Sequence, residues 1–226
     1  MVPPQADGWA QLIYATQGIL QVESPPGERL WFVPAHRALW VPAGTRTMLA
    51  MRGEVRLRMI YLASDECEGL PLECRGLNVP PLLREVALEV VRRSVVPRGE
   101  PLAELLRELI AGAETTPLAL PMPQDARARR VAEMLVRDPS CSRTLVELGH
   151  SAGASTRTLE RLFSEETGLR FSAWRQRLRV LSGLDRMLHG ASVAEAAFAV
   201  GYENTSAFIA IFRETLGETP GKWLRK

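Results

Sequence analysis

Four neighbouring side chains have the types and the spacing needed to bind DNA bases: Thr156, Arg157, Glu160 and Arg161. At the periodicity of an α-helix they share one face, and the apolar residues between them face inward. An arginine on such a face can donate two hydrogen bonds to guanine, and a glutamate can accept one from cytosine. The pattern predicts a helix that contacts base pairs, although for each arginine the solvent face of an ordinary helix is the simpler alternative.

The equivalent positions in a second, similar segment are Thr205, Ser206, Ile209 and Ala210, which carry no charge and no amide. Such a surface can hold phosphates through hydroxyls and backbone N–H groups, and it can contact thymine methyl groups. Arg213 follows on the same segment and is expected to help position the protein. We therefore expect unequal roles, in which the arginines of the first segment select the sequence and the second segment anchors the protein.

The two segments belong to an internal repeat, Leu145–Trp174 and Val193–Trp223. The matched pairs are Glu147 with Glu195, Gly153 with Gly201, Phe163 with Phe212, Gly168 with Gly217 and Trp174 with Trp223. Each copy predicts a short helix, a turn that begins at glycine and a longer helix capped by Ser155 or Asn204. This is the layout of a helix-turn-helix, predicted at 145–166 and 193–216. Two hairpins that serve only as scaffold are the alternative.

A further helix is predicted between the copies, at Ser172–Leu188, with Gly190 just beyond its end. At about 1.5 Å per residue it would span roughly 25 Å. A rigid connector of that length can set two recognition helices on successive major grooves, about 34 Å apart. Arg175, Arg177 and Arg179 lie along this helix, where they would face either phosphates or solvent.

Residues 125–226 resemble the DNA-binding domain of the AraC/XylS family of transcription regulators. The resemblance is carried by AVGY, SAFIAIFR and LGETPGKW in the second copy, and by TRTLERLFSEETG and the following Trp-Arg in the first. The residues expected at DNA are those of both second helices and their caps: Ser155, Thr156, Arg157, Glu160, Arg161, Asn204, Thr205, Ser206 and Arg213. Gly149 and Ser151 depart from the family pattern, so a less firmly held first helix is expected.

Charge and composition narrow the class of protein. The chain of 226 residues is 46% hydrophobic and has a net charge of +2. Residues 125–226 hold 16 basic and 12 acidic side chains, a balance of +4, and the preceding part holds 12 and 14, a balance of −2. The positive excess lies where phosphates are expected, although a solvated face would show the same balance. No signal peptide and no run of about 18 apolar residues is present, so a cytoplasmic protein without membrane contact is expected.

Cysteine and histidine are scarce in this chain, with three of each and no CxxC pair. Free thiols are therefore expected, and neither a disulfide framework nor a metal site is. The other class of function considered is an enzyme in the N-terminal barrel, such as a cupin isomerase or dioxygenase. That chemistry needs a metal or an acid–base pair, and His36 is the only histidine there. No catalytic residue and no cofactor is predicted.

Residues 1–114 are predicted to form a separate domain that begins with β-structure. Six runs of β-favouring residues are separated by turn signals: Gln11–Thr16, Ile19–Glu23, Arg29–Val33, Ala38–Val41, Thr45–Met51 and Val55–Leu62. Strands so short and close together predict a small antiparallel barrel or sandwich. Amphipathic helices at 82–94 and 100–113 either cap the barrel or form a dimer seam. The uncharged, proline-rich segment 115–124 predicts an extended linker.

The N-terminal region resembles the cupin-like barrels of the same family through the motifs WAQLIYATQG and RALWVPAG. The resemblance implies a domain that binds a small-molecule effector of unknown identity and that dimerises through residues 82–113. Relatives carry histidines where this chain has Gln5, Asp7 and Thr47, so we predict that no metal is bound. The chain begins close to the first motif, so the barrel is either truncated or preceded by further residues.

Together these features predict an α+β chain, with a small cupin-like β-barrel and two amphipathic helices followed by an all-α double helix-turn-helix domain. The predicted function is that of a cytoplasmic, dimeric, sequence-specific regulator of transcription. Its partners would be double-stranded DNA and, by resemblance, an effector and RNA polymerase. The alternative left open is a DNA-free interaction partner or antagonist of a related regulator, because the base-facing positions of the second recognition helix carry no charge.

Overall fold

The computed structural model describes residues 8–51 and 55–224, which form two compact units. The division falls between Leu118 and Ala119, inside the predicted linker, and the short piece Gly27–Leu30 groups with the second unit. Over the described part of the chain, no helix is long and apolar enough to cross a membrane. Gln5 and Asp7, two of the three positions on which the metal prediction rests, lie outside the described residues.

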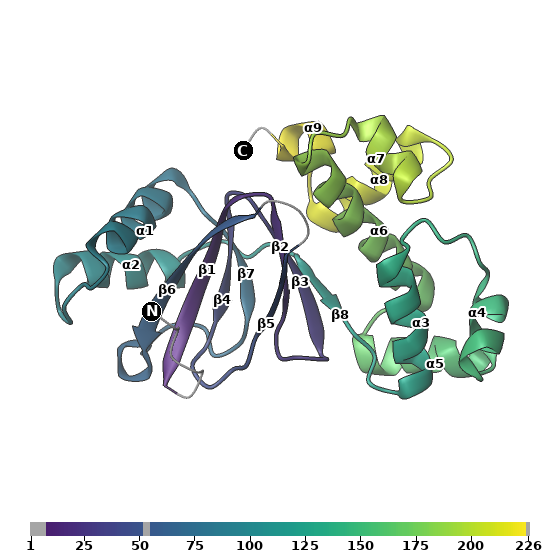
Figure 1. Ribbon diagram of the computed structural model, residues 1–226, viewed down its shortest axis with the longest axis horizontal. Coiled ribbons are helices and arrows are strands. Elements are labelled where there is room, and N and C mark those ends of the chain that lie inside the picture. The colour runs from purple at the N-terminus through teal and green to yellow at the C-terminus, as the bar shows by residue number, and fades with distance from the viewer. Residues whose placement is uncertain (1–7, 52–54, 225–226) are drawn as a thin grey trace. The chain divides into compact units, whose positions relative to one another are not determined.

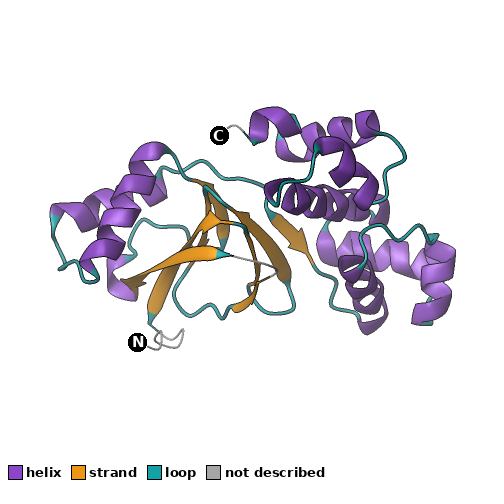
Figure 2. Cartoon of the chain, turned by 45° about the horizontal axis from the view of Figure 1, so that its top comes forward, coloured by secondary structure: helices purple, strands orange, loops and turns teal. Residues whose placement is uncertain are grey.

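The described residues form eight short strands in two four-stranded sheets (Figures 1 and 2). The strands are β1 (Trp9–Gln17), β2 (Ile19–Glu23), β3 (Arg29–Pro34), β4 (Arg37–Val41), β5 (Met48–Met51), β6 (Arg56–Ala63), β7 (Arg75–Asn78) and β8 (Ala119–Pro121). One sheet has the order β6-β1-β4-β7 and the other β5-β2-β3-β8. All six predicted strands are present, and the barrel-like antiparallel architecture is confirmed. The sequence pattern does not predict β7 and β8.

Strand β1 shows why the barrel strands have nearly continuous apolar runs. It lies between two antiparallel neighbours, so that Leu12 is opposite Trp40 of β4 on one side and Ile60 of β6 on the other. Alternate residues of a strand point to opposite faces of the sheet. Here Leu12 and the next residue, Ile13, are both buried. Because both faces of this sheet are covered, strict alternation of polar and apolar residues is not required.

Two helices cover one face of the β1-containing sheet, α1 (Pro81–Arg93) and α2 (Pro101–Ala111), and Figure 2 shows them beside the strands. Leu83 of α1 and Leu106 of α2 share one buried cluster with Trp40 of β4. The apolar stripes therefore cap the barrel, which was one of the two alternatives. Leu82, at the start of α1, points away from this cluster and is 56% exposed.

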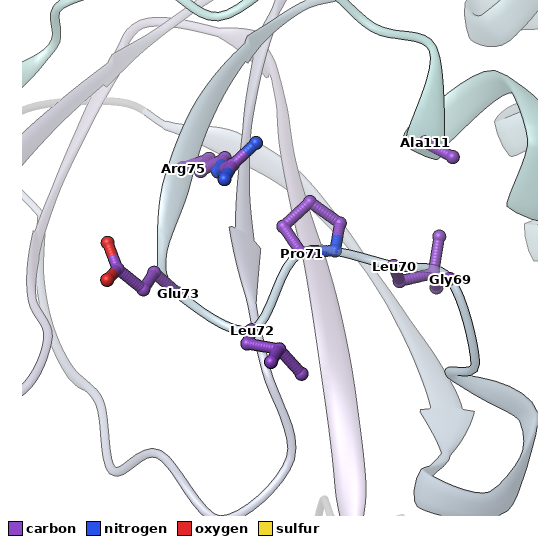
Figure 3. Close-up of a pocket in the computed structure, with 7 residues that line it drawn as sticks. All are labelled: Gly69, Leu70, Pro71, Leu72, Glu73, Arg75 and Ala111. Atoms are coloured by element: carbon purple, nitrogen blue, oxygen red, sulfur yellow. The ribbon is translucent and has the colours of Figure 1, made fainter.

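An open hollow of about 410 Å³ lies beside the chain between β6 and β7 (Figure 3). Its lining consists of Gly69, Leu70, Pro71, Leu72, Glu73, Arg75 and Ala111. Leu72 is 90% exposed, and the two charged residues are exposed as well. Small-molecule sites usually enclose their ligand among apolar walls with a few buried polar groups. We therefore assign no effector to this hollow.

The segment predicted as an extended linker is extended and is also held in place along its length. Its beginning pairs with β7, where Thr116 N donates to Gly76 O at 2.9 Å. Its middle forms β8, and Leu118 and Leu120 are fully buried. Its prolines cannot donate backbone hydrogen bonds, but Pro121 O accepts one from Trp174 Nε1 at 2.6 Å.

From Ala119 onward, the described part of the second unit is helical apart from β8. Its helices are α3 (Ala126–Arg137), α4 (Leu145–Ala152), α5 (Thr156–Thr167), α6 (Phe171–Leu188), α7 (Val193–Ala199), α8 (Thr205–Leu216) and α9 (Pro220–Trp223). Within this unit, α3 packs on α4 and α5, and α5 packs on α6. Helices α7 and α8 also pack on α6. Figure 1 shows α6 running between the two groups. Two helix-turn-helix units joined by one long helix are therefore present.

Candidate nucleic-acid interface

Both helix-turn-helix units begin with the same capping box. In α4 the hydroxyl of Thr144 accepts from Glu147 N, and Glu147 accepts from Thr144 N at 2.7 Å. In α7 Ser192 and Glu195 make the same reciprocal pair. These hydrogen bonds lower the pKa of both glutamates below its ordinary value. A capping box satisfies otherwise unpaired N–H groups at a helix start, so the repeat extends to the chemistry that fixes each leading helix.

The turn of each unit also follows the predicted design. Gly153 and Gly201 have φ of 70° and 85°, in the left-handed region that side chains disfavour. The second helix of each unit is then capped, because Ser155 Oγ accepts from Thr158 N at 3.1 Å and Asn204 Oδ1 accepts from Ala207 N at 2.8 Å. Ser155 and Asn204 were predicted to contact DNA. In the structure their side-chain oxygens accept the hydrogen bonds that cap the two helices.

The four predicted base-contacting side chains of α5 lie on one exposed face. Thr156, Arg157, Glu160 and Arg161 are all exposed, and the opposite face of the helix is buried in the core of the unit. Among the described residues, the Arg157 side chain has no hydrogen-bond or ion-pair partner. Arg161 differs, because it is paired with the carboxylate of Glu165 one turn later. The two arginines are thus available to DNA to different degrees.

The corresponding face of α8 is less polar and less exposed. Thr205 and Ile209 are half-buried, whereas Ser206 and Ala210 are exposed. Arg213 is exposed and lies in the last turn of α8, away from the end that begins at Asn204. The face therefore offers hydroxyls, methyl groups and first-turn N–H groups, and its cation lies well along the helix.

The Arg161–Glu165 pair provides a prediction about DNA affinity. Replacing Glu165 by glutamine removes a negative charge and releases Arg161, so we expect affinity for duplex DNA to rise about two- to fivefold at 0.1 M salt. Glu214→Gln is the matched control, because it makes the same change at the equivalent position of α8, where Ala210 stands in place of the arginine. Fluorescence anisotropy with labelled duplex DNA measures both, and an equal gain in the two variants would contradict the release of Arg161.

The faces opposite the candidate interface hold each second helix in place. Phe163 packs edge-on against Trp174 with ring centroids 5.2 Å apart, and in the second unit Phe208 packs against Phe212 at 5.7 Å. All four side chains are fully buried. Aromatic contacts of this kind fix the rotation of a helix about its axis, so they decide which residues face outward.

Gly149, the departure from the family pattern, has a packing reason. A Cβ atom at this position would lie 2.5 Å from Ala154 O and 3.3 Å from Leu159 Cδ1. The glycine is buried and lets α4 approach the turn and α5 closely. The helix interior therefore contains a weak helix former because a side chain would not fit, and the capping box compensates at the helix start.

Gly149→Ala is consequently expected to destabilise the fold although alanine favours helix. The propensity gain of about 1 kcal/mol opposes an overpacking cost of about 1–3 kcal/mol, and the clash is with backbone that cannot rotate away. We expect a lower midpoint of chemical denaturation. Gly221→Ala is the control, because a Cβ there meets nothing within 4 Å. A Gly149→Ala chain at least as stable as the parent would show that the contact yields easily.

The arginines of α6 are not placed as the sequence predicts. Arg175 Nη1 donates to Arg143 O at 2.9 Å, and Arg179 Nε donates to Pro139 O at 3.1 Å. Burial lowers the pKa of the Arg177 guanidinium, which is largely removed from solvent. Arg175 and Arg179 therefore donate to backbone carbonyls of the loop between α3 and α4, which lies against their face of α6. Helical periodicity contains no signal for that loop contact.

Comparison with known proteins places these features in context. A helix-turn-helix domain family model matches residues 148–226. The chain is 31% identical over 222 residues to the HTH-type transcriptional regulator NimR of Escherichia coli strain K12. This match covers 96% of this chain and 80% of NimR. It is 29% identical over 222 residues to the HTH-type transcriptional regulator RipA of Corynebacterium glutamicum, covering 93% of this chain and 60% of RipA. A crystal structure of a DNA-binding transcriptional dual regulator from Escherichia coli K-12 aligns with 45% of this chain and 92% of its own length, at 25% identity and a TM-score of 0.41.

Proposed function

The chain belongs to the AraC/XylS family of DNA-binding transcription regulators, and we propose that it engages DNA with α5 and α8 in successive major grooves. The length of α6 supports this placement. Its 18 residues span about 27 Å at a rise of about 1.5 Å per residue. One turn of B-form DNA is about 34 Å, so helices held at the two ends of α6 are separated by a distance of the required order.

The two recognition helices have different tasks in this proposal. Arg157 and Arg161 of α5 contact guanine, with Glu160 available to accept from cytosine. Thr205 and Ser206 of α8 hold phosphates together with the first-turn N–H groups, and Arg213 adds a phosphate contact further along the helix. The observation that carries the proposal is the difference between the two faces: that of α5 is exposed and charged, whereas that of α8 is uncharged and only partly exposed.

The remaining parts of the proposal concern the first unit and the cell. We infer a homodimer through residues 82–113, supported by the 56% exposure of Leu82 on the side of α1 away from the barrel core. A small-molecule effector and RNA polymerase complete the partners that a regulator of this family needs. The protein would act in the cytoplasm, without catalytic activity of its own.

Footprinting of the purified chain on duplex DNA from upstream of its own gene tests the two-groove placement. Hydroxyl radicals should reveal two protected windows about one helical turn apart on one face of the DNA. Binding should weaken steeply between 50 and 200 mM salt, as expected for several phosphate contacts. A single protected window would contradict the engagement of α8, and no binding even at low salt would favour a DNA-free interaction partner.

A further inference from the structure

Within the helical part of the chain, Arg179 lies where α6, the loop before α4 and the turn before α8 meet. It projects from α6, and its guanidinium donates to Pro139 O and to Cys141 O, both at 3.1 Å. These two carbonyls belong to the loop that precedes the first helix-turn-helix unit. The same guanidinium lies over the ring of Tyr202, 5.7 Å from its centroid, and Tyr202 is in the turn of the second helix-turn-helix unit. One side chain thus contacts both the loop before the first helix-turn-helix unit and the turn of the second helix-turn-helix unit.

The loop and the turn approach each other closely at this point. A Cβ atom added to Gly201 would lie 2.9 Å from Ser140 O and 2.9 Å from Arg179 Nη2. The turn of the second helix-turn-helix unit therefore lies directly against the loop backbone. The guanidinium of Arg179 contacts both of these segments and stacks on the Tyr202 ring. Arginine suits this position because its planar group donates several hydrogen bonds in fixed directions and also stacks on an aromatic face.

The connecting helix has a weak point that such a contact would brace. Gly183 lies in the interior of α6, between Arg179 and the end of the helix that carries the second unit. Glycine is required there because a Cβ would lie 2.7 Å from the Phe208 ring. A glycine within a helix permits bending that a larger residue resists. Gly183 therefore lets α8 pack closely on α6, and it also makes α6 less stiff between the two helix-turn-helix units.

We propose that Arg179 is a positioning residue that fixes the orientation of the two recognition helices relative to each other. It does so by joining the 139–141 loop to the Gly201–Tyr202 turn across the flexible point at Gly183. Arg175 provides the contrast. Its guanidinium also donates to the loop carbonyls of Cys141 and Arg143, but among the described residues it makes no hydrogen bond or ring contact with the second helix-turn-helix unit. This inference rests on the proposed function, in which both helices meet DNA at a set separation.

A distance measurement without DNA tests the brace directly. Spin labels would be placed at Ser164→Cys in α5 and Glu214→Cys in α8, both exposed, in a chain whose three cysteines are replaced by alanine. Pulsed electron resonance should give a narrow distribution for the parent, and Arg179→Met should broaden it about twofold or more as the hinge is released. Arg175→Met is the matched control and should leave the width unchanged, because it loosens the same loop without touching the second unit.

Two further results decide the inference. Equal widths in the parent and Arg179→Met, or equal broadening by Arg179→Met and Arg175→Met, would overturn it. If circular dichroism shows that Arg179→Met does not fold, Tyr202→Leu takes its place, because this variant removes the ring and keeps the carbonyl hydrogen bonds. The distribution of Tyr202→Leu should also broaden, and an unchanged width would overturn the inference.

DNA spacing supplies the functional readout. On the upstream duplex that the parent protects, one base pair inserted between the two contacted blocks should weaken parental binding on the order of tenfold, but that of Arg179→Met less than about threefold. Equal sensitivity of the two proteins to the insertion would overturn the inference. If only one block is contacted, the proposed function fails instead, and the DNA-free distance distributions still decide whether Arg179 is a brace.

Discussion

Replacing Phe208 by alanine is expected to lower the free energy of unfolding of the compact unit that contains both helix-turn-helix units by about 3–5 kcal/mol. Phe208 is fully buried and packs between the rings of Tyr202 and Phe212, at centroid distances of 5.4 and 5.7 Å. Its ring also fills the space that Gly183 leaves free on α6. Truncation would leave a cavity bounded by two helices, and the surroundings cannot close it without moving α8.

Phe198→Ala is the matched control for this prediction. Phe198 lies in the neighbouring helix α7 and is 57% exposed, so the same change in residue type should cost less than about 1 kcal/mol. Chemical denaturation followed by circular dichroism measures both variants, and hydrogen exchange should report faster opening of α8 in Phe208→Ala. Similar destabilisation by the two changes would mean that the Phe208 ring does not hold the recognition helix.

The second large effect concerns DNA selectivity. Arg157→Ala should reduce discrimination at one base position by about 1–3 kcal/mol, roughly five- to 150-fold in relative affinity. The reason is that Arg157 is exposed on the outward face of α5 and is not occupied by an acidic partner among the described residues. A bidentate contact to guanine can therefore form without first breaking an ion pair, in contrast to Arg161.

Competition binding with operator variants measures this effect. Each base pair of the protected duplex would be changed in turn, and the affinities of parent and Arg157→Ala compared. Arg137→Ala, which removes an exposed charge from the last turn of α3, should weaken binding to all variants alike or leave it unchanged. A uniform loss with Arg157→Ala would make this residue a phosphate contact and remove the basis for unequal roles.

The helix-turn-helix units could be predicted from sequence because their signals are local. A capping residue, a glycine in the turn and a buried aromatic recur at nearly constant offsets, and each acts on backbone within a few residues. The predicted ranges 145–166 and 193–216 accordingly agree with α4–α5 and α7–α8 to within a residue. The face of α5 that carries Arg157 follows from the same periodicity.

The features that the sequence does not reveal depend on contacts between distant segments. Strand β7 contains Gly76, which disfavours strands on its own, but a Cβ there would lie 2.8 Å from Thr116 O of the passing chain. Strand β8 lies among prolines and forms because a neighbouring strand supplies its partners. Arg179 has the pattern of a solvent-facing residue until the loop at Pro139 is placed against it.

Sequencing of duplexes selected by the purified chain from a randomised pool tests the central claim, the unequal roles of α5 and α8. We expect two blocks about one helical turn apart, one rich in information and containing the guanine that Arg157 contacts, the other weak and dominated by A·T pairs. With Arg157→Ala the strong block should lose that guanine and the weak block should be unchanged. Two equally informative blocks, or a strong block unaffected by Arg157→Ala, would contradict the claim.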